Sequence, residues 1–149
     1  LVRAYEKYQA PIMGIQKTSV QQIMACGNIE LVEGTMRVKD LIEKPKKEEI
    51  QSELVEFGRM VLTSEIIQVL KRTPTGRGGE LWLIDAIKKY IQEGGVVYAQ
   101  AVEGGSWQTT GAPLNHLKAI VMYALDRKDI GPEFKEYLKS ILEKEVGGA

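Results

Sequence analysis

The sequence of 149 residues is poor in the side chains that build disulfides and zinc centres. It contains one cysteine, Cys26, and one histidine, His116. A single cysteine cannot form an internal disulfide, and no Cys/His set has the spacing of a zinc site. These absences argue against a disulfide-stabilised secreted domain, and we expect a reducing, cytoplasmic location.

An excess of charge is also lacking, because 20 Lys and Arg residues balance 20 Asp and Glu residues. Nothing electrostatic therefore draws the chain as a whole to nucleic acid or to an anionic membrane. No apolar stretch approaches the roughly 20 residues that a membrane-spanning helix needs. We expect neither a nucleic-acid nor a membrane partner. The first residue is Leu1 rather than methionine, from which we expect processing, further residues or a longer parent chain.

The hydrophobic fraction of 44% and the charged fraction of 27% are typical of one packed domain. Periodicity and turn residues predict an α/β or α+β fold with about five strands and four helices. The predicted strands cover 12–17, 28–32, 35–43, 54–62 and 96–102, and the longer helices cover 81–91, 113–125 and 134–142. A hairpin turn falls at Glu33-Gly34. The continuous apolar character of 54–62 after its start predicts a strand buried on both faces.

The tripeptide Glu43-Lys44-Pro45 stands at the end of a predicted strand. A carboxylate can accept hydrogen bonds from sugar hydroxyls, and an ammonium can bind a phosphate as a compact charge. Neighbouring residues of a regular strand point to opposite faces, so both can serve one ligand only if the strand ends or twists here. Taken alone, the tripeptide favours a solvated ion pair at the end of a strand over a ligand site.

The glycine-rich loop 73–79 precedes Glu80 and Asp85. It does not end in Gly-Lys-Ser/Thr, so it is not a Walker phosphate loop. Near the start of a helix, the two carboxylates are favourable without any catalytic role. We interpret Cys26 as a small buried thiol rather than a nucleophile, and His116 as a surface residue rather than a base.

Four segments together resemble the C-terminal part of the UTP–glucose-1-phosphate uridylyltransferases, and the resemblance covers nearly the whole chain. They are Glu43-Lys44-Pro45, Gly58-Arg59, Gly78 to Ala86 and Trp107 to Ala119. The resemblance implies a Rossmann-like nucleotidyltransferase fold, with a mixed sheet flanked by helices. It also implies that residues 1–149 form the sugar-phosphate-binding part, whereas the N-terminal nucleotide-binding half is absent.

The same resemblance implies roles for individual residues. Glu43 would bind the glucose hydroxyls, and Lys44 would bind the phosphate of glucose 1-phosphate as the catalytic cation. Gly27 follows as a substrate contact, since a glycine lets the backbone approach the sugar. Thr109 stands where the family has an aspartate that helps hold Mg²⁺, so either the metal is held by an aspartate outside this chain or Thr109 binds it through water. Trp82 stands where the family usually has glutamine.

The activity that the resemblance implies belongs to carbohydrate metabolism. It is uridylyl transfer from UTP to glucose 1-phosphate, which gives UDP-glucose and pyrophosphate. We expect this chain alone to be inactive, and to associate with itself or with the N-terminal half of the enzyme. Two alternatives stay open. One is a related nucleotidyltransferase that uses dTTP or another sugar phosphate, and the other is a non-catalytic sugar-phosphate-binding or assembly subunit.

Overall fold

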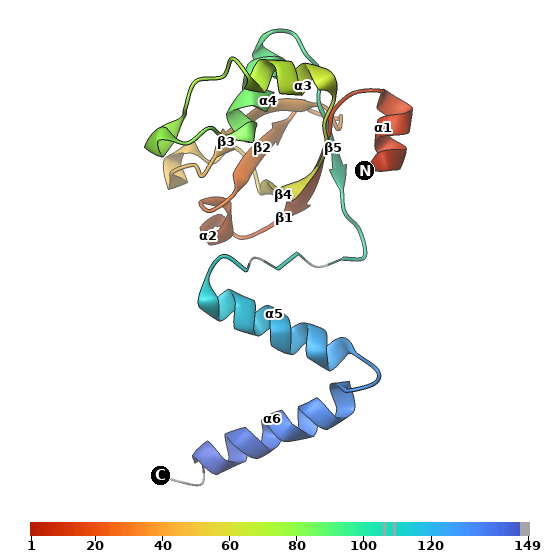
Figure 1. Cartoon of the computed structure of the whole chain (residues 1–149), viewed down its shortest axis with the longest axis vertical. Coiled ribbons are helices and arrows are strands. Elements are labelled where there is room, and N and C mark those ends of the chain that lie inside the picture. Colours follow the sequence, from red (N-terminus) through yellow and green to blue (C-terminus); the bar gives the residue numbers. More distant parts are fainter. Residues whose placement is uncertain (106, 109, 147–149) are drawn as a thin grey trace. The chain divides into compact units, whose positions relative to one another are not determined.

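A computed structural model describes residues 1–105, 107–108 and 110–146. The chain divides into two compact units, Leu1–Gly105 and Ser106–Ala149. The first unit contains a sheet with its covering helices, and the second contains two helices (Figure 1).

The first unit is built on a five-stranded mixed sheet. Its strands are β1 (Ile12–Lys17), β2 (Gly27–Leu31), β3 (Val38–Glu43), β4 (Leu54–Val61) and β5 (Tyr98–Ala101). They lie in the order β3-β2-β4-β1-β5. The β1–β5 pair is parallel, and the other pairs are antiparallel. The predicted mixed sheet is confirmed, as is the hairpin that turns at Glu33-Gly34 between β2 and β3.

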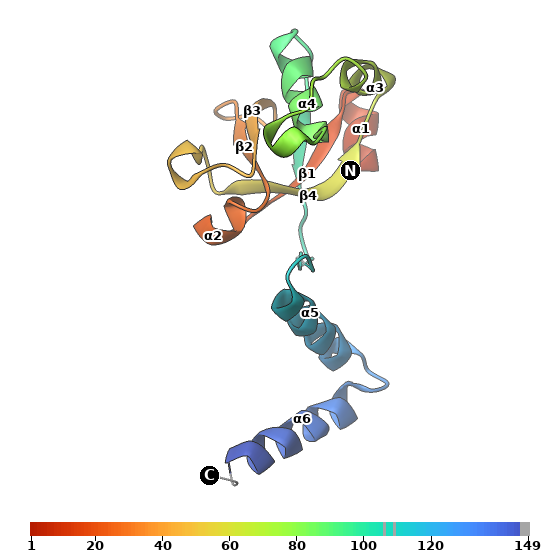
Figure 2. The ribbon, with the colours of Figure 1, turned by 60° about the vertical axis from the view of Figure 1, so that its left-hand side comes forward.

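Helices α3 (Ser64–Leu70) and α4 (Leu83–Gln92) pack against each other and lie on the same side of the sheet (Figure 2). The unit also contains α1 (Val2–Tyr8), α2 (Val20–Ile23) and two short 3₁₀ helices, Lys47–Glu49 and Arg77–Gly79. The core between this helical layer and the sheet consists of Met13, Ile15, Ile29, Val38, Leu41, Ile66, Ile84, Ile87, Val97 and Ala99.

Helix α4 shows why the sequence folds as it does locally. Its apolar residues recur at helical spacing, and Ile84 and Ile87 are buried against the sheet. An ion pair fixes the helix to β3, because Lys88 Nζ lies 2.8 Å from Asp40 Oδ1 and also donates a hydrogen bond to the Leu41 carbonyl at 3.2 Å. This pair therefore helps to hold α4 against β3.

Strand β4 differs from the prediction that it is buried on both faces. Only Val55 is buried along its length, and Gly58 and Arg59 are exposed. Gly58 has φ of +77°, and the pairing with β1 shifts between Met13 and Ile15. An irregularity of this kind bends a strand and breaks the regular alternation of its side chains. The prediction of burial on both faces was wrong because a run of apolar residues in the sequence carries no information about such a bend.

The second unit contains α5 (Pro113–Asp126) and α6 (Gly131–Val146), which contact each other. The apolar stripes predicted on these helices are largely exposed: Leu114 and Leu117 are each 61% exposed, and Leu142 is 62% exposed. His116 is exposed on α5, as expected. Among the described residues, none of the helices is both long enough and apolar enough to cross a bilayer.

Candidate sugar-phosphate site

Three residues from neighbouring strands form a row on the sheet face that α4 covers. Gly27 on β2 is paired with Glu43 on β3. A Cβ atom on Gly27 would lie 2.8 Å from Glu56 Cγ on β4, 3.3 Å from Glu43 Oε2 and 3.3 Å from Ile84 Cδ1. Only glycine fits here without moving its neighbours. The structure thus brings the predicted residues Gly27 and Glu43 together, and adds Glu56 to them.

The carboxylates of this row lie in a partly dehydrated setting. Burial raises the pKa of the Glu43 carboxyl, and Glu56 raises it further, whereas Lys44 lowers it. Burial also raises the pKa of Glu56, although the Gly58 amide donates a hydrogen bond to Glu56 Oε2 at 2.7 Å and opposes the shift. Both groups would therefore be stabilised by a ligand that donates hydrogen bonds to them.

Cys26 lies beside this row and is half-buried rather than fully buried. Burial raises the pKa of its thiol, and the nearby Glu56 and Glu43 carboxylates add to the rise. A thiol with a raised pKa is a poor source of thiolate. The raised pKa therefore favours the interpretation of Cys26 as an unreactive thiol.

Lys44 leaves the strand in a conformation that is uncommon for a residue with a side chain. Its φ is +43°, in the left-handed region. Its amide donates a hydrogen bond to the Cys26 carbonyl at 3.0 Å, and its Nζ lies 4.0 Å from Glu43 Oε1. The strand therefore ends at this point, which is the condition under which both side chains can serve one ligand. The Glu43 side chain is 15% exposed, and that of Lys44 is 51% exposed.

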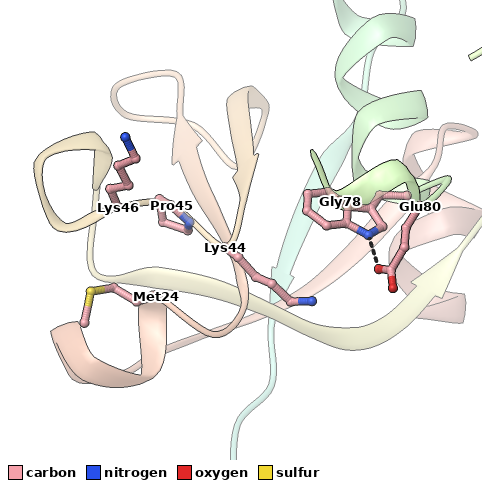
Figure 3. A pocket seen from close by; sticks show the side chains of 7 residues that line it. Met24, Lys44, Pro45, Lys46, Gly78 and Glu80 are labelled. Carbon is pink, nitrogen blue, oxygen red and sulfur yellow. Dashed lines mark hydrogen bonds between the residues drawn. The ribbon is translucent and has the colours of Figure 1, made fainter. Parts of the chain in front are cut away.

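A pocket opens beside Lys44, with a volume of about 500 Å³. Figure 3 shows Lys44 extending from the end of β3 toward the loop that carries Gly78 and Glu80, while Lys46 and Met24 lie on the other side. The lining residues are Met24, Lys44, Pro45, Lys46, Gly78, Glu80 and Trp82. Glu43 and Gly27 are not among them.

Trp82 faces Lys44 within this pocket. The Lys44 Nζ lies 5.3 Å from the centroid of the Trp82 ring, a cation–π distance. The indole Nε1–H donates a hydrogen bond to Glu80 Oε2 at 2.8 Å. Sequence reasoning left Glu80 and Trp82 out of the site, although a tryptophan directly after a glycine-rich loop was a usable signal. It also missed Glu56, whose signal was a carboxylate inside an apolar run.

The predicted metal-binding residue, Thr109, lies outside the residues that the structure describes. Within the described part of the chain, no group of three or more His, Cys, Asp or Glu side chains could hold a metal ion.

A model of the nucleotidyl transferase family matches residues 1–124. The chain belongs to this family. Among the relatives of this nucleotidyl transferase is the UTP–glucose-1-phosphate uridylyltransferase of Bacillus subtilis, which is 31% identical over 97% of the chain and 50% of the relative. The UTP–glucose-1-phosphate uridylyltransferase 2 of Staphylococcus saprophyticus is 32% identical over 95% of the chain and 49% of the relative.

Solved structures give the same result for the fold. The UTP-bound UDP-glucose pyrophosphorylase of Acinetobacter baumannii matches with a TM-score of 0.76 at 27% identity, over 92% of this chain and 47% of that protein. A UDP-glucose pyrophosphorylase in complex with UDP-glucose matches with a TM-score of 0.73 at 28% identity, over 84% and 48%. The predicted Rossmann-like nucleotidyltransferase fold is confirmed. The chain spans about half the length of the curated relatives it matches.

Proposed function

We propose that this chain supplies the sugar-phosphate site of a UTP–glucose-1-phosphate uridylyltransferase. The observation that carries the proposal is the conformation at the end of β3, where the left-handed Lys44 presents its ammonium to a pocket directly beside Glu43. Backbone strain of about 1–3 kcal/mol is kept where the surrounding structure needs that geometry. The uridylyltransferases among the relatives supply the reaction to which this site belongs.

Lys44 and Glu43 bind different parts of the ligand. Lys44 offers a half-exposed ammonium, a compact charge that suits a phosphate group. Glu43 lies deeper, and its carboxylate accepts hydrogen bonds from sugar hydroxyls. Lys46 adds a second cation to the pocket lining. A hexose 1-phosphate therefore has its phosphate at the open side and its ring toward the sheet.

The reaction asks little covalent chemistry of these residues. An anionic phosphate oxygen of glucose 1-phosphate attacks the α-phosphorus of UTP in line, a new P–O bond forms, and pyrophosphate leaves. No general base is required because the attacking oxygen carries no proton. The protein contributes alignment and charge neutralisation, and Lys44 serves both by holding the sugar phosphate in place.

The resemblance to the uridylyltransferases also implies a cofactor, partners and a cellular location. Mg²⁺ is the proposed cofactor, although no group of three or more His, Cys, Asp or Glu side chains among the described residues could hold it. The proposed partners are UTP, glucose 1-phosphate and either further copies of the chain or the N-terminal half of the enzyme. A cytoplasmic role in carbohydrate metabolism belongs to the same proposal.

Isothermal titration calorimetry with glucose 1-phosphate tests the site. We expect Lys44→Ala to weaken binding about 10-fold or more, since a hydrogen bond to a charged group contributes about 1.5–3 kcal/mol. The matched control is Lys47→Ala, which removes an exposed lysine that does not line the pocket. Equal binding by both variants would contradict the role of Lys44. A wild-type chain that binds no glucose 1-phosphate would refute the proposed site.

The activity is tested separately with UTP, glucose 1-phosphate and Mg²⁺. We expect no UDP-glucose from the purified 149-residue chain alone, and formation of UDP-glucose once a nucleotide-binding half from a relative is supplied. Turnover by the purified chain would contradict the expectation that it is inactive alone. Sugar-phosphate binding without turnover in any mixture would favour the non-catalytic subunit.

A further inference from the structure

The pocket contains an aromatic side chain for which the proposed function gives no role. Trp82 precedes α4 and lines the same pocket as Lys44. The indole is half-buried, so part of its surface is accessible to a ligand. The other uncharged side chains of the lining, Met24 and Pro45, come from the opposite side of the pocket. Among the described residues that line the pocket, Trp82 is therefore the one with an aromatic side chain.

The orientation of this surface is fixed by the loop before it. The indole Nε1–H donates a hydrogen bond to Glu80 Oε2 at 2.8 Å. The Glu80 carbonyl in turn accepts a hydrogen bond from the Gly76 amide at 2.8 Å, which ties the residue into its loop. A ring anchored at its polar edge presents its face in one direction, with little entropy left to lose when a ligand binds.

The face of the ring is directed at the phosphate-binding cation. The Lys44 Nζ lies 5.3 Å from the Trp82 ring centroid. A phosphate bound to this ammonium is joined to the sugar by a single bridging oxygen. The sugar ring must therefore lie within a few bonds of the place where the lysine cation now covers the indole.

We propose that Trp82 is a specificity-determining residue on which the pyranose ring of the bound sugar phosphate stacks, and that Glu80 is the positioning residue that holds the indole for it. The inference rests on the proposed sugar-phosphate site and deepens it. A pyranose ring has an apolar face of C–H groups, and packing this face on an indole removes apolar area from water. Inorganic phosphate has no such face. Trp82 therefore discriminates between a hexose 1-phosphate and inorganic phosphate, whereas Lys44 binds the phosphate group of either ligand.

The chain permits a direct optical test because it contains only two tryptophans. In the Trp107→Phe background, which leaves the pocket lining unchanged, Trp82 is the single tryptophan. This variant is titrated with glucose 1-phosphate and, separately, with inorganic phosphate. Trp82 fluorescence and calorimetric affinity are followed in parallel. The expected result is a saturable change in Trp82 fluorescence with glucose 1-phosphate. Its midpoint should fall at the same ligand concentration as the midpoint of the calorimetric titration.

The substitutions separate stacking from a structural role. We expect Trp82→Ala to weaken glucose 1-phosphate binding about 5- to 10-fold and to leave phosphate binding within about 2-fold, since an aromatic contact contributes about 0.5–1.5 kcal/mol beyond area burial. Trp82→Phe keeps a ring and should recover most of the affinity. Glu80→Ala should weaken glucose 1-phosphate binding about 3-fold, whereas Glu80→Gln, which keeps an acceptor for the indole N–H, should not.

Two results would overturn the inference while leaving the proposed function intact. One is glucose 1-phosphate binding that Trp82→Ala leaves unchanged. The other is an equal loss of glucose 1-phosphate and phosphate binding in Trp82→Ala and Trp82→Phe, which would show that the indole only supports the pocket. If the Trp107→Phe chain and the wild type bind neither ligand, the proposed sugar-phosphate site itself fails and the inference fails with it.

Discussion

Replacing Glu56 by glutamine should stabilise the protein at neutral pH. The Glu56 carboxylate lies across Gly27 from that of Glu43, and both are partly withdrawn from water. Glutamine has almost the same shape and keeps an oxygen that can accept the hydrogen bond from the Gly58 amide. The substitution therefore removes the charge of Glu56 and little else.

The magnitude follows from the position of Gly27. A Cβ atom there would lie 2.8 Å from Glu56 Cγ and 3.3 Å from Glu43 Oε2, so these two atoms are at most about 6 Å apart, which sets the scale of the separation between the two carboxylates. Two like charges at about 6 Å repel by about 3 kcal/mol at an effective dielectric constant of about 20. Because both carboxylates are only partly buried, screening by water reduces this to about 1 kcal/mol. We expect Glu56→Gln to raise the free energy of unfolding by about that amount.

The pH dependence of the free energy of unfolding shows whether the Glu56 charge stabilises or destabilises the folded state. A carboxyl whose pKa is raised on folding binds its proton more tightly in the folded state than in the unfolded state. Its destabilising effect is therefore absent in acid and grows as the pH rises from the unfolded pKa through the folded pKa. The gain from Glu56→Gln should be full at neutral pH and vanish in acid.

Urea denaturation of the variant and the wild type at neutral and acidic pH measures this difference. The matched control is Glu53→Gln, because Glu53 precedes the same strand, has a side chain that is 75% exposed and pairs with Lys17 at the surface. That control should change stability by only a few tenths of a kcal/mol. A Glu56→Gln variant that is less stable at neutral pH, or a gain that does not vary with pH, would refute the reasoning.

Two further predictions concern other parts of the chain. Asp40→Asn should lower the free energy of unfolding by about 1 kcal/mol at neutral pH, because it weakens the half-buried pair with Lys88 that joins α4 to β3. Burial acts to raise the pKa of Asp40, but hydrogen bonds from Lys88 and Gln51 outweigh it and lower that pKa. The loss of stability caused by Asp40→Asn should therefore shrink as the pH falls through the pKa of Asp40 in the folded state. Urea titrations at several pH values measure this loss, and a loss that is the same at every pH would contradict the prediction. The exposed Leu117 and Leu142 lead us to expect self-association of the chain. Light scattering should show it, the double substitution Leu117→Lys and Leu142→Lys should reduce it, and a monomeric wild type would contradict it.

Local sequence patterns predicted most of the elements correctly. The strand at 12–17 has the predicted bounds, and the turn at Glu33-Gly34 joins β2 and β3. The helix predicted over 81–91 is α4, which ends before Gly94, a glycine with φ of +93°. These features succeed because side-chain periodicity and turn residues act over a few neighbouring positions.

The site depended on information that is not local. The tripeptide Glu43-Lys44-Pro45 marked the end of β3, and its sequence identified Glu43 and Lys44 as candidates. Whether one ligand can contact both depends on the left-handed conformation of Lys44, which the sequence only allowed. Glu56 and Trp82 entered only when strands and loops far apart in sequence were placed side by side.

The sequence by itself determined the family, the mixed α/β fold and the Glu-Lys pair, because these are written in short motifs and in the spacing of apolar residues. The tertiary structure decided which side chains share the pocket, that β4 bends at Gly58, and that Glu56 lies beside Glu43. The physical reason is that strand order, register and burial arise from contacts between distant segments, and no local pattern encodes the partner of a residue across the sheet.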